Sequence, residues 1–442
     1  MVAMAEKTYQ ESVNTREIAV NALYEILEQG AYSHIMMNDV LSKYQYLDKN
    51  MRSYINRTVL GTVEKKLTLD YIIDNYSKTK TKKLKPWIRT SLRLAVYEIL
   101  FMDSVPDHAA VDEAVRTVKK HGLKSLSGFC NGVLRSIVRG KEAGDIAKLL
   151  NEAPNEAKYS IPEWIIDLWV SQYGSETAET ICEGFLENPD LSVRVDMSDC
   201  GWQEIMDELA EDGVEVKRDI ELDDIVYLKG VNYLAGLTAF KEGHIYPQDA
   251  SSARVAHELD YKNVMQVIDV CAAPGGKACH VGAIMSAKGC SGEVIACDIS
   301  DKKVDLIKEN INRLGSSNVV AKRQDATMLN GDYINCFDAV VADVPCSGLG
   351  VIRKKPDIRY RITPEDLVSI AELQKKIINN VCQYVKNGGE LIYSTCTINK
   401  EENENQVKSF IKTHPEFELV SEQIITDVEG NDGFYICKMK KS

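Results

Sequence analysis

Apolar residues recur along the chain with two different periods, and the first period covers about 145 residues. Within the stretches Ile18–Leu27 and Ile88–Leu100 they return every three or four positions, a spacing that predicts amphipathic helices. Asn14, with Glu17 three residues later, is typical of the start of a helix. The first region is therefore predicted to be all-helical.

From about residue 260 onward, short apolar runs alternate with amphipathic segments such as Lys302–Leu314 and Asp366–Tyr384. Strands that alternate with helices predict a doubly wound α/β sheet. In such sheets, ligands bind at the carboxyl ends of the strands. The predicted strands are Val267–Cys271, Glu293–Cys297, Val319–Lys322, Phe337–Ala342, Glu390–Ser394 and Phe434–Met439.

The segment between these regions has a shorter, mixed pattern. Pro162 begins a predicted helix, Leu191–Met197 alternates like a strand, and Trp202–Leu209 has helical spacing. This mixture predicts a small α+β module or linker. The predicted domains are an all-α domain at 1–145, the small acidic α+β module at 146–240, and an α/β Rossmann-like domain at 241–442.

Charge is distributed unevenly over the 442 residues, whose net charge is −13. Residues 1–150 carry a net charge of +6, residues 151–260 a net charge of −18, and residues 261–442 a net charge of −1. Only the first stretch therefore suits a polyanion. It includes the basic run Lys78–Lys85, which is either a solvated loop or a contact for phosphate groups, since lysines supply sequence-independent affinity for nucleic acid.

The sequence gives no sign of a membrane or export segment. No stretch approaches the roughly 18 consecutive apolar residues of a membrane helix. The segment Met1–Glu17 lacks the apolar core of a signal peptide. We therefore expect a cytoplasmic protein with no membrane contact.

Cysteines are numerous, but their spacing does not indicate a metal site. There are twelve, and no two are three positions apart, so the chain has no Cys-x-x-Cys zinc knuckle. An intracellular chain keeps its thiols reduced, and most of these cysteines are expected to be small buried side chains. We expect no metal.

A glycine-rich segment, Asp269–Lys277, follows the first predicted strand of the α/β region. Glycine lets the backbone approach a ligand closely, and the helix N-terminus that follows favours anionic or polar groups. A nucleoside-triphosphate loop would need glycine at position 271 and Ser or Thr at 278, where the chain has Cys271 and Ala278. The adjacent Gly275 and Gly276 do not fit the Gly-x-Gly-x-x-Gly pattern of dinucleotide sites.

Acidic residues follow the next two predicted strands. Asp298 lies 22 residues beyond Gly276, at the end of the second strand, where an acid accepts hydrogen bonds from a ribose diol. An adenosine-bearing cofactor without a pyrophosphate fits both this acid and the loop. Asp325, after the third strand, could receive an adenine amino group, and the alternative is a helix N-cap.

Two cysteines follow neighbouring predicted strands. Cys346 lies in "DVPCSGLG" and Cys396 in "YSTCT", so we expect both thiols at the same edge of the sheet, close to the cofactor. A thiolate near cationic groups or a helix N-terminus has a lowered pKa and becomes nucleophilic. The residues alone do not decide which cysteine attacks.

The helical region resembles a known RNA-binding fold. The stretches "REIAVNALYEILEQGAY", "PDHAAVDEAVRTVKK" and "FCNGVLRSIVRG", spread over residues 14–140, are similar to the NusB antitermination factor. The resemblance implies a helical module that docks on RNA. The alternative is a helical bundle used only for protein contacts.

The α/β region resembles one enzyme family. "DVCAAPGGK", "DVPCSGLG" and "YSTCT" are similar to the motif set of the Nop/Sun (RsmB/Sun) family of S-adenosylmethionine-dependent RNA cytosine-5 methyltransferases. Further matches are "YPQDASS", "RKKPDIRYR", "KEENENQV" and "DGFYICKM". Ala278 departs from the family, which usually has Thr there. Together with the NusB-like module, the resemblance implies methylation of a cytosine in small-subunit (16S) ribosomal RNA.

The resemblance also implies roles for individual residues. Cys396 matches the family nucleophile, which forms a covalent adduct with the base, and Cys346 matches the cysteine that assists product release. Asp343 would hydrogen-bond the cytosine ring. The implied S-adenosylmethionine site comprises Cys271, Ala272, Ala273, Pro274, Gly275, Gly276, Lys277, Asp298, Lys303, Asp325 and Asp343.

We expect the partner to be ribosomal RNA of the small subunit, unassembled or partly assembled, and the enzyme to act as a monomer. Two alternatives stay open within this interpretation. One is the same reaction on transfer RNA or large-subunit RNA, whose enzymes share the catalytic motifs. The other is a non-catalytic RNA-binding protein of the antitermination type. A nicotinamide oxidoreductase is disfavoured by the missing dinucleotide pattern.

Overall fold

The structure is a computed structural model that describes residues 13–187, 190–197, 201–231, 233–426, 428 and 430–442. The chain forms two compact units. The first contains the described residues up to Leu186 together with Ile352–Arg361, and the second contains the described residues of 187–351 and 362–442. Within the described part of the chain, no helix is long and apolar enough to cross a membrane.

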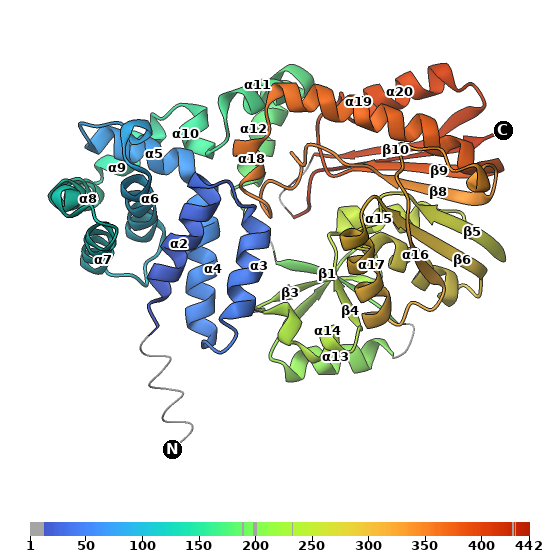
Figure 1. Ribbon diagram of the computed structural model, residues 1–442, viewed down its shortest axis with the longest axis horizontal. Coiled ribbons are helices and arrows are strands. Elements are labelled where there is room, and N and C mark those ends of the chain that lie inside the picture. Colours follow the sequence, from blue (N-terminus) through green and yellow to red (C-terminus); the bar gives the residue numbers. More distant parts are fainter. Residues whose placement is uncertain (1–12, 188–189, 198–200, 232, 427, 429) are drawn as a thin grey trace. The chain divides into compact units, whose positions relative to one another are not determined.

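The first unit is all-helical, as the apolar spacing predicts (Figure 1). Helix α2 (Thr15–Glu28) begins after Asn14, whose side chain accepts a hydrogen bond from the Glu17 N–H at 3.0 Å. Helix α6 (Pro86–Phe101) is central, because most of its residues, including all of Thr90–Ile99, are buried. The other elements are α3 (Ser33–Lys43), α4 (Lys49–Glu64), α5 (Lys66–Tyr76), η1 (Thr81–Lys83), α7 (Asp107–Lys120), η2 (Lys124–Leu126), α8 (Ser127–Glu142), α9 (Asp145–Asn151), α10 (Asn155–Tyr159), α11 (Glu163–Tyr173), α12 (Ser175–Gly184) and α18 (Ile358–Arg361).

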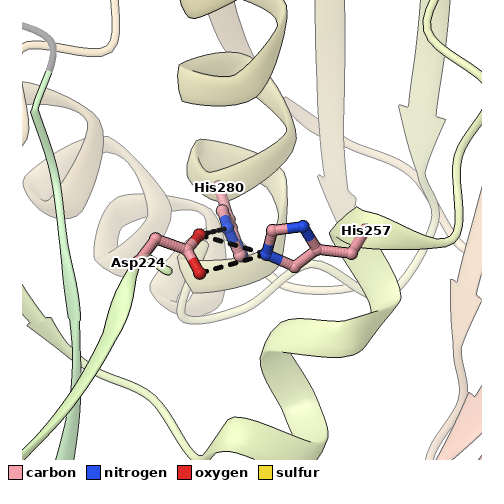
Figure 2. Close-up of side chains that lie close together, drawn as sticks. All are labelled: Asp224, His257 and His280. Carbon is pink, nitrogen blue, oxygen red and sulfur yellow. Dashed lines mark hydrogen bonds and ion pairs between the residues drawn. The ribbon is translucent and has the colours of Figure 1, made fainter. Parts of the chain in front are cut away.

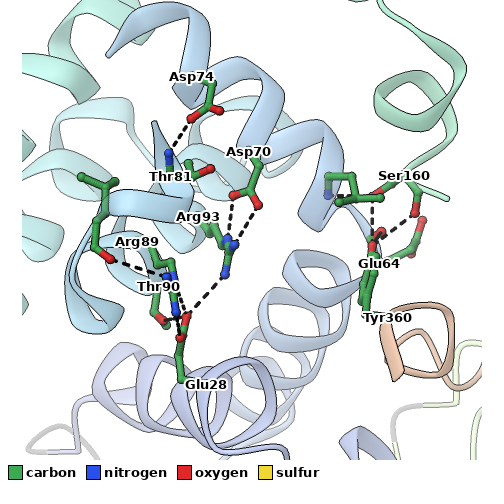
Figure 3. Close-up of polar contacts among 12 residues, drawn as sticks. Glu28, Glu64, Asp70, Asp74, Thr81, Arg89, Thr90, Arg93, Ser160 and Tyr360 are labelled. Atoms are coloured by element: carbon green, nitrogen blue, oxygen red, sulfur yellow. Dashed lines mark hydrogen bonds and ion pairs between the residues drawn. The ribbon is translucent and has the colours of Figure 1, made fainter. Parts of the chain in front are cut away.

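Charged side chains join three of these helices inside the first unit (Figure 3). Glu28, at the end of α2, accepts hydrogen bonds from Arg89 and Arg93 of α6. Arg93 also donates two hydrogen bonds of 2.7 Å to the carboxylate of Asp70 in α5. The side chains of Glu28 and Arg93 are almost fully buried. The attraction between the opposite charges therefore offsets the free-energy cost of removing them from water.

A segment distant in sequence completes the first unit. Arg359 of α18 is 1% exposed, and its guanidinium donates to the backbone carbonyls of Ser160 at 3.1 Å and Ile352 at 2.8 Å. The Tyr360 hydroxyl donates to the Glu64 carbonyl at 2.9 Å (Figure 3). The stretch Ile352–Arg361 therefore packs as an integral part of the helical unit.

The second unit begins with a four-stranded antiparallel sheet in the order β2-β3-β1-β4. The predicted strand and helix at 191–209 are confirmed as β1 and α13. The domain boundaries expected at 145/146 and 240/241 stay predictions, although β4 lies beyond the second of them. The elements are β1 (Leu191–Val195), α13 (Trp202–Glu211), β2 (Glu215–Arg218), β3 (Ile225–Lys229), η3 (Leu234–Gly236), α14 (Thr238–Lys241) and β4 (Ile245–Pro247).

A seven-stranded sheet in the order β10-β11-β9-β8-β5-β6-β7 forms the rest of the second unit. The strands β9, β8, β5, β6 and β7 are parallel, and β11 and β10 extend the sheet beyond β9 with antiparallel pairing. All six strands expected in this region are confirmed. The elements are α15 (Ala250–His257), β5 (Val264–Asp269), α16 (Gly276–Ala287), β6 (Ser291–Asp298), α17 (Asp301–Arg313), β7 (Val319–Arg323), η4 (Gly331–Tyr333), β8 (Phe337–Asp343), α19 (Pro364–Val381), η5 (Cys382–Tyr384), β9 (Val385–Thr395), α20 (Glu404–Thr413), β10 (Phe417–Ile425) and β11 (Phe434–Lys441).

Both faces of this sheet are covered by helices. Ile377 of α19 and Phe410 of α20 belong to the apolar core on one face. Val255 of α15, Val281 of α16 and Ile307 of α17 belong to the core on the other. The architecture is the doubly wound one that the alternating pattern predicts.

Candidate active site

The candidate active site lies where the parallel strands of the large sheet end. In the strand register, Asp343 at the end of β8 pairs with Ser394 of β9, and Asp269 at the end of β5 pairs with Val341 and Ala296 on its two sides. Their carboxyl ends therefore meet at one edge of the sheet, where ligands bind in folds of this type.

The two predicted cysteines lie side by side at this edge. The Sγ atoms of Cys346 and Cys396 are 3.2 Å apart, and both residues are half-buried. The hydrogen bond with Cys396 and burial raise the pKa of the Cys346 thiol. Cys346 is therefore a protonated thiol in contact with the sulfur of Cys396.

A buried carboxylate fixes the loop that carries Cys346. Glu402 is fully buried and accepts hydrogen bonds from the Ser347 N–H at 2.8 Å and the Ser347 hydroxyl at 2.6 Å. The amide groups of Gln374 and Asn399 also donate to it, at 3.1 and 3.0 Å. Buried acceptors of this kind hold their donors in one geometry, so Glu402 positions the loop after β8 against the segment after β9.

A lysine of the glycine-rich segment adds positive charge to the site. Lys277 Nζ is 2.8 Å from Asp343 Oδ2, and Asp343 Oδ1 accepts a hydrogen bond from the Ser394 hydroxyl at 2.8 Å. Burial alone would lower the pKa of Lys277. The charges of Asp343 and Cys396 have a larger, opposite effect, so the net pKa is raised and the ammonium stays charged. A cation beside a cysteine favours the thiolate.

The predicted cofactor loop is held close to Asp298, the acid at the end of β6. The Ala273 N–H donates to Asp298 Oδ2 at 3.1 Å, and Lys303 Nζ is 3.0 Å from Asp298 Oδ1. Gly275 has a φ of +106°, a conformation that glycine adopts without strain. A Cβ on Gly276 would lie 2.4 Å from the Tyr246 ring, so backbone alone fits there.

Asp269 supplies a feature that fits a cationic cofactor. Its side chain is buried, and among the described residues its Oδ2 atom has no hydrogen-bond partner. Burial, and then the charge of Asp343, raise its pKa to about 7. An unpartnered buried carboxylate oxygen beside the loop suits the positive groups of S-adenosylmethionine, so the residues present fit that cofactor.

Other predicted residues have local contacts. Asp325, just after β7, accepts hydrogen bonds from the Thr327 N–H at 2.8 Å and the Thr327 hydroxyl at 2.7 Å. This contact closes a short turn. No helix begins at Asp325, because the next helical element, η4, begins at Gly331 and has Asn330 as its N-cap, so the N-cap alternative is wrong. Ala278 is fully buried in the core behind the loop. Burial strongly raises the pKa of Cys271, so Cys271 contributes backbone and packing to the loop.

Two site residues were not predicted. Asp269 appears in the sequence only as the first residue of the glycine-rich motif, and Glu402 lies in the polar stretch "KEENENQV". A run of acids and amides is typical of an exposed surface, so nothing in the composition indicates that Glu402 is buried. Its position in a motif shared with the resembled family is the one signal that points to it.

A glycine loop at the centre of a doubly wound, mostly parallel sheet, followed by an acid at the end of the next strand, defines an S-adenosylmethionine-dependent methyltransferase domain. Residues 256–440 match the model of the family described as 16S rRNA methyltransferase RsmB/F. Residues 13–139 match the NusB family, and residues 161–232 match the ferredoxin-like domain of RsmF/B-like methyltransferases. The chain belongs to the RsmB/F family.

Known proteins and solved structures are similar to most of the chain. The probable ribosomal RNA small subunit methyltransferase B of Bacillus subtilis (strain 168) is 37% identical, over 97% of this chain and 99% of the relative. The crystal structure of PH0851 has a TM-score of 0.80 at 25% identity, covering 97% of this chain and 99% of its own. NSun6 from Pyrococcus horikoshii, solved with SFG, shares the fold with a TM-score of 0.58 at 23% identity over 63% of this chain and 98% of its own.

Proposed function

We propose that the protein methylates carbon 5 of a cytosine in small-subunit ribosomal RNA through a covalent cysteine adduct. The observation that carries this proposal is the pair of thiols, Cys346 and Cys396, with sulfurs 3.2 Å apart beside the predicted cofactor loop. The names of the relatives support ribosomal RNA of the small subunit as the substrate.

The reaction needs a nucleophilic side chain, because carbon 5 of cytosine is itself not nucleophilic enough to attack a methyl group directly. The Cys396 thiolate adds to carbon 6, which forms a carbon–sulfur bond and shifts the ring electrons towards carbon 5. The loop that contains Gly275 and Gly276, together with Asp298, would hold S-adenosylmethionine, which would supply an electrophilic methyl group for carbon 5. Loss of the carbon-5 proton to a base then expels Cys396 and restores the aromatic ring.

Three side chains support these steps. Lys277, a half-buried cation, favours the thiolate form of Cys396. Asp343, held by Lys277 and Ser394, is proposed to hydrogen-bond the ring nitrogen and amino group of the base and to stabilise the adduct. Cys346 assists release of the product and, as a thiol, can return a proton to the departing sulfur.

The helical unit is proposed to bind the RNA. Its match to the NusB family and the net charge of +6 over residues 1–150 support this role. The base must leave its stack or be single-stranded to reach the half-buried thiols.

The test is methyl transfer from labelled S-adenosylmethionine to unmodified small-subunit RNA, with denaturing gels alongside. We expect label in cytosine with the wild type and none with Cys396→Ala. Cys346→Ala should accumulate a gel-stable protein–RNA complex, because the adduct forms and is not resolved. Cys290→Ala, which removes a half-buried cysteine elsewhere in the same unit, is the matched control and should behave like the wild type.

Different failures overturn different parts of the proposal. Normal turnover by Cys396→Ala would overturn the covalent mechanism. Label on transfer RNA or large-subunit RNA, with none on small-subunit RNA, would keep the chemistry and overturn the substrate. RNA binding without methyl transfer by the wild type to any of these RNAs would favour the non-catalytic alternative.

A further inference from the structure

Three side chains from separate segments meet beside α16 (Figure 2). Asp224 directly precedes β3, His257 ends α15, and His280 lies in α16. His280 Nε2 is 2.6 Å from Asp224 Oδ2, and His257 Nε2 is 3.1 Å from both oxygens of Asp224. The three donor atoms all lie within 4.8 Å of one another.

We propose that Asp224, His257 and His280 bind one divalent transition-metal ion, for which zinc suits the donors best. Two imidazole nitrogens and a carboxylate oxygen are a common zinc ligand set. Zinc binds such atoms at about 2.0–2.2 Å, so neighbouring ligand atoms around a tetrahedral ion lie about 3.3–3.6 Å apart. The separations of 2.6 to at most 4.8 Å in this cluster bracket that range.

The contacts around Asp224 are ones that a metal ion can replace. His257 Nε2 and His280 Nε2 both face the Asp224 carboxylate at hydrogen-bond distance. Because metal ligands must be deprotonated, the ion would take the place of the protons in these contacts.

The surrounding charge is negative. Arg194, the cation that faces His280, is paired with Asp196 at 3.6 Å. Arg254 pairs with Glu221. The connection between β2 and β3 carries further acids besides Asp224 and Glu221, namely Asp219 and Asp223. The paired arginines therefore leave an excess of negative charge around the cluster, which favours a cation.

One side of the cluster is open to solvent. The His257 side chain is 38% exposed, whereas that of His280 is 1% exposed. The three side chains leave the fourth position of a tetrahedral ion for water. The ion would join the small sheet to α16, whose first turn contains Lys277, and so stabilise the second unit.

The experiment measures zinc binding by the purified full chain with isothermal titration and elemental analysis, after treatment with a chelator. Cobalt(II) absorption reports the ligands, because cysteine ligands give a strong near-ultraviolet charge-transfer band that histidine and carboxylate ligands lack. His257→Ala and Asp224→Asn remove one ligand each. His244→Ala is the matched control, because His244 also pairs with one carboxylate, Glu208, at 2.8 Å in the same unit.

We expect one tightly bound zinc per wild-type chain, a rise in Tm on adding zinc, and a cobalt spectrum without a thiolate band. His257→Ala and Asp224→Asn should bind at least about tenfold more weakly and lose the rise in Tm, while His244→Ala keeps both. Zinc binding that is absent from the wild type, unchanged in His257→Ala, or accompanied by a thiolate band would overturn the proposal and leave a hydrogen-bonded cluster only.

Discussion

At the scale of single residues, the buried carboxyl group of Asp269 couples the site to pH. Its pKa is raised to about 7 by burial and by the charge of Asp343, whereas an unfolded aspartate titrates near 4. The native chain therefore binds more protons than the unfolded chain between about pH 4 and pH 7. The contribution of this group to stability is complete below pH 4 and is lost as the pH rises to about 7.

Replacing Asp269 with Asn removes this titration and keeps the acceptor for the Cys271 N–H. The free energy of unfolding of Asp269→Asn, relative to the wild type, should therefore increase by roughly 2–3 kcal/mol between pH 5 and pH 8. Urea titrations at several pH values measure it.

Asp338→Asn is the control with the opposite sign. Burial alone would raise the pKa of Asp338. The hydrogen bonds from the Gln266 N–H and Lys386 have a larger, opposite effect, so the pKa is lowered. Its contribution to stability is present above about pH 4 and is lost at lower pH.

A relative stability of Asp269→Asn that does not change between pH 5 and pH 8 would show that Asp269 is ionised throughout.

Single residues also mark the limit of sequence-based prediction. Cys346 and Cys396 could be predicted as neighbours, because each lies within three residues of the end of a strand and parallel strands end at one edge. Glu402 could not, because its burial depends on tertiary contacts with Gln374 and Ser347. The cluster of Asp224, His257 and His280 has spacings of 33 and 23 residues, which match no metal-binding motif.

At the scale of elements, the first unit depends on the charged contacts that join α2, α5 and α6. The Glu28 side chain is 3% exposed and faces both Arg89 and Arg93 (Figure 3). Glu28→Gln removes the negative charge and leaves Arg89 without its ion-pair partner. We expect the free energy of unfolding of the first unit to fall by roughly 2–3 kcal/mol.

Chemical denaturation followed by the fluorescence of Trp87, which stacks on Tyr24 of α2, measures this loss. Glu25→Gln on the same helix is the matched control, because Glu25 is exposed, and it should change the stability by less than about 0.5 kcal/mol. Equal effects of the two substitutions would mean that the contacts of Glu28 contribute no more than a surface charge.

Elements with a clear period could be predicted, and short or irregular ones could not. Helix α6 and the parallel strands were found because their buried faces follow one period over many residues. Strand β2 has one half-buried residue among exposed ones, and β10 alternates weakly with a bulge between Leu419 and Ser421. Edge strands of this kind bury too few side chains to produce a hydrophobic pattern in the sequence.

At the scale of the whole molecule, the chain passes between its two units more than once. Gly350, two residues before Ile352, donates a hydrogen bond to the Cys396 carbonyl at 3.1 Å in the second unit. From Ile352 to Arg361 the chain belongs to the helical unit, and it then returns. The segment thus links the loop of Cys346 covalently to the helices.

A fragment of residues 187–442 tests this arrangement. It lacks the Ser160 and Glu64 carbonyls that hold Arg359 and Tyr360 in the full chain. Trypsin should therefore cut within 352–361 faster in the fragment than in the full chain, since cleavage requires local unfolding. Cleavage within α17 is the internal control and should be unchanged. Equal rates at 352–361 would show that these contacts give the segment no protection.

The same segment imposes a delay on the protein during its synthesis. The helices up to Leu186 are translated about 175 residues before Arg361, which at roughly 5–20 residues per second is a wait of about 9–35 s. Until then, the nascent N-terminal unit lacks the segment Ile352–Arg361, which packs beside Ser160 and Glu64 in the complete protein. A ribosome stalled before codon 361 would carry helices that have formed but cannot reach their final packing, and completion of the first unit is thus one of the last events of translation.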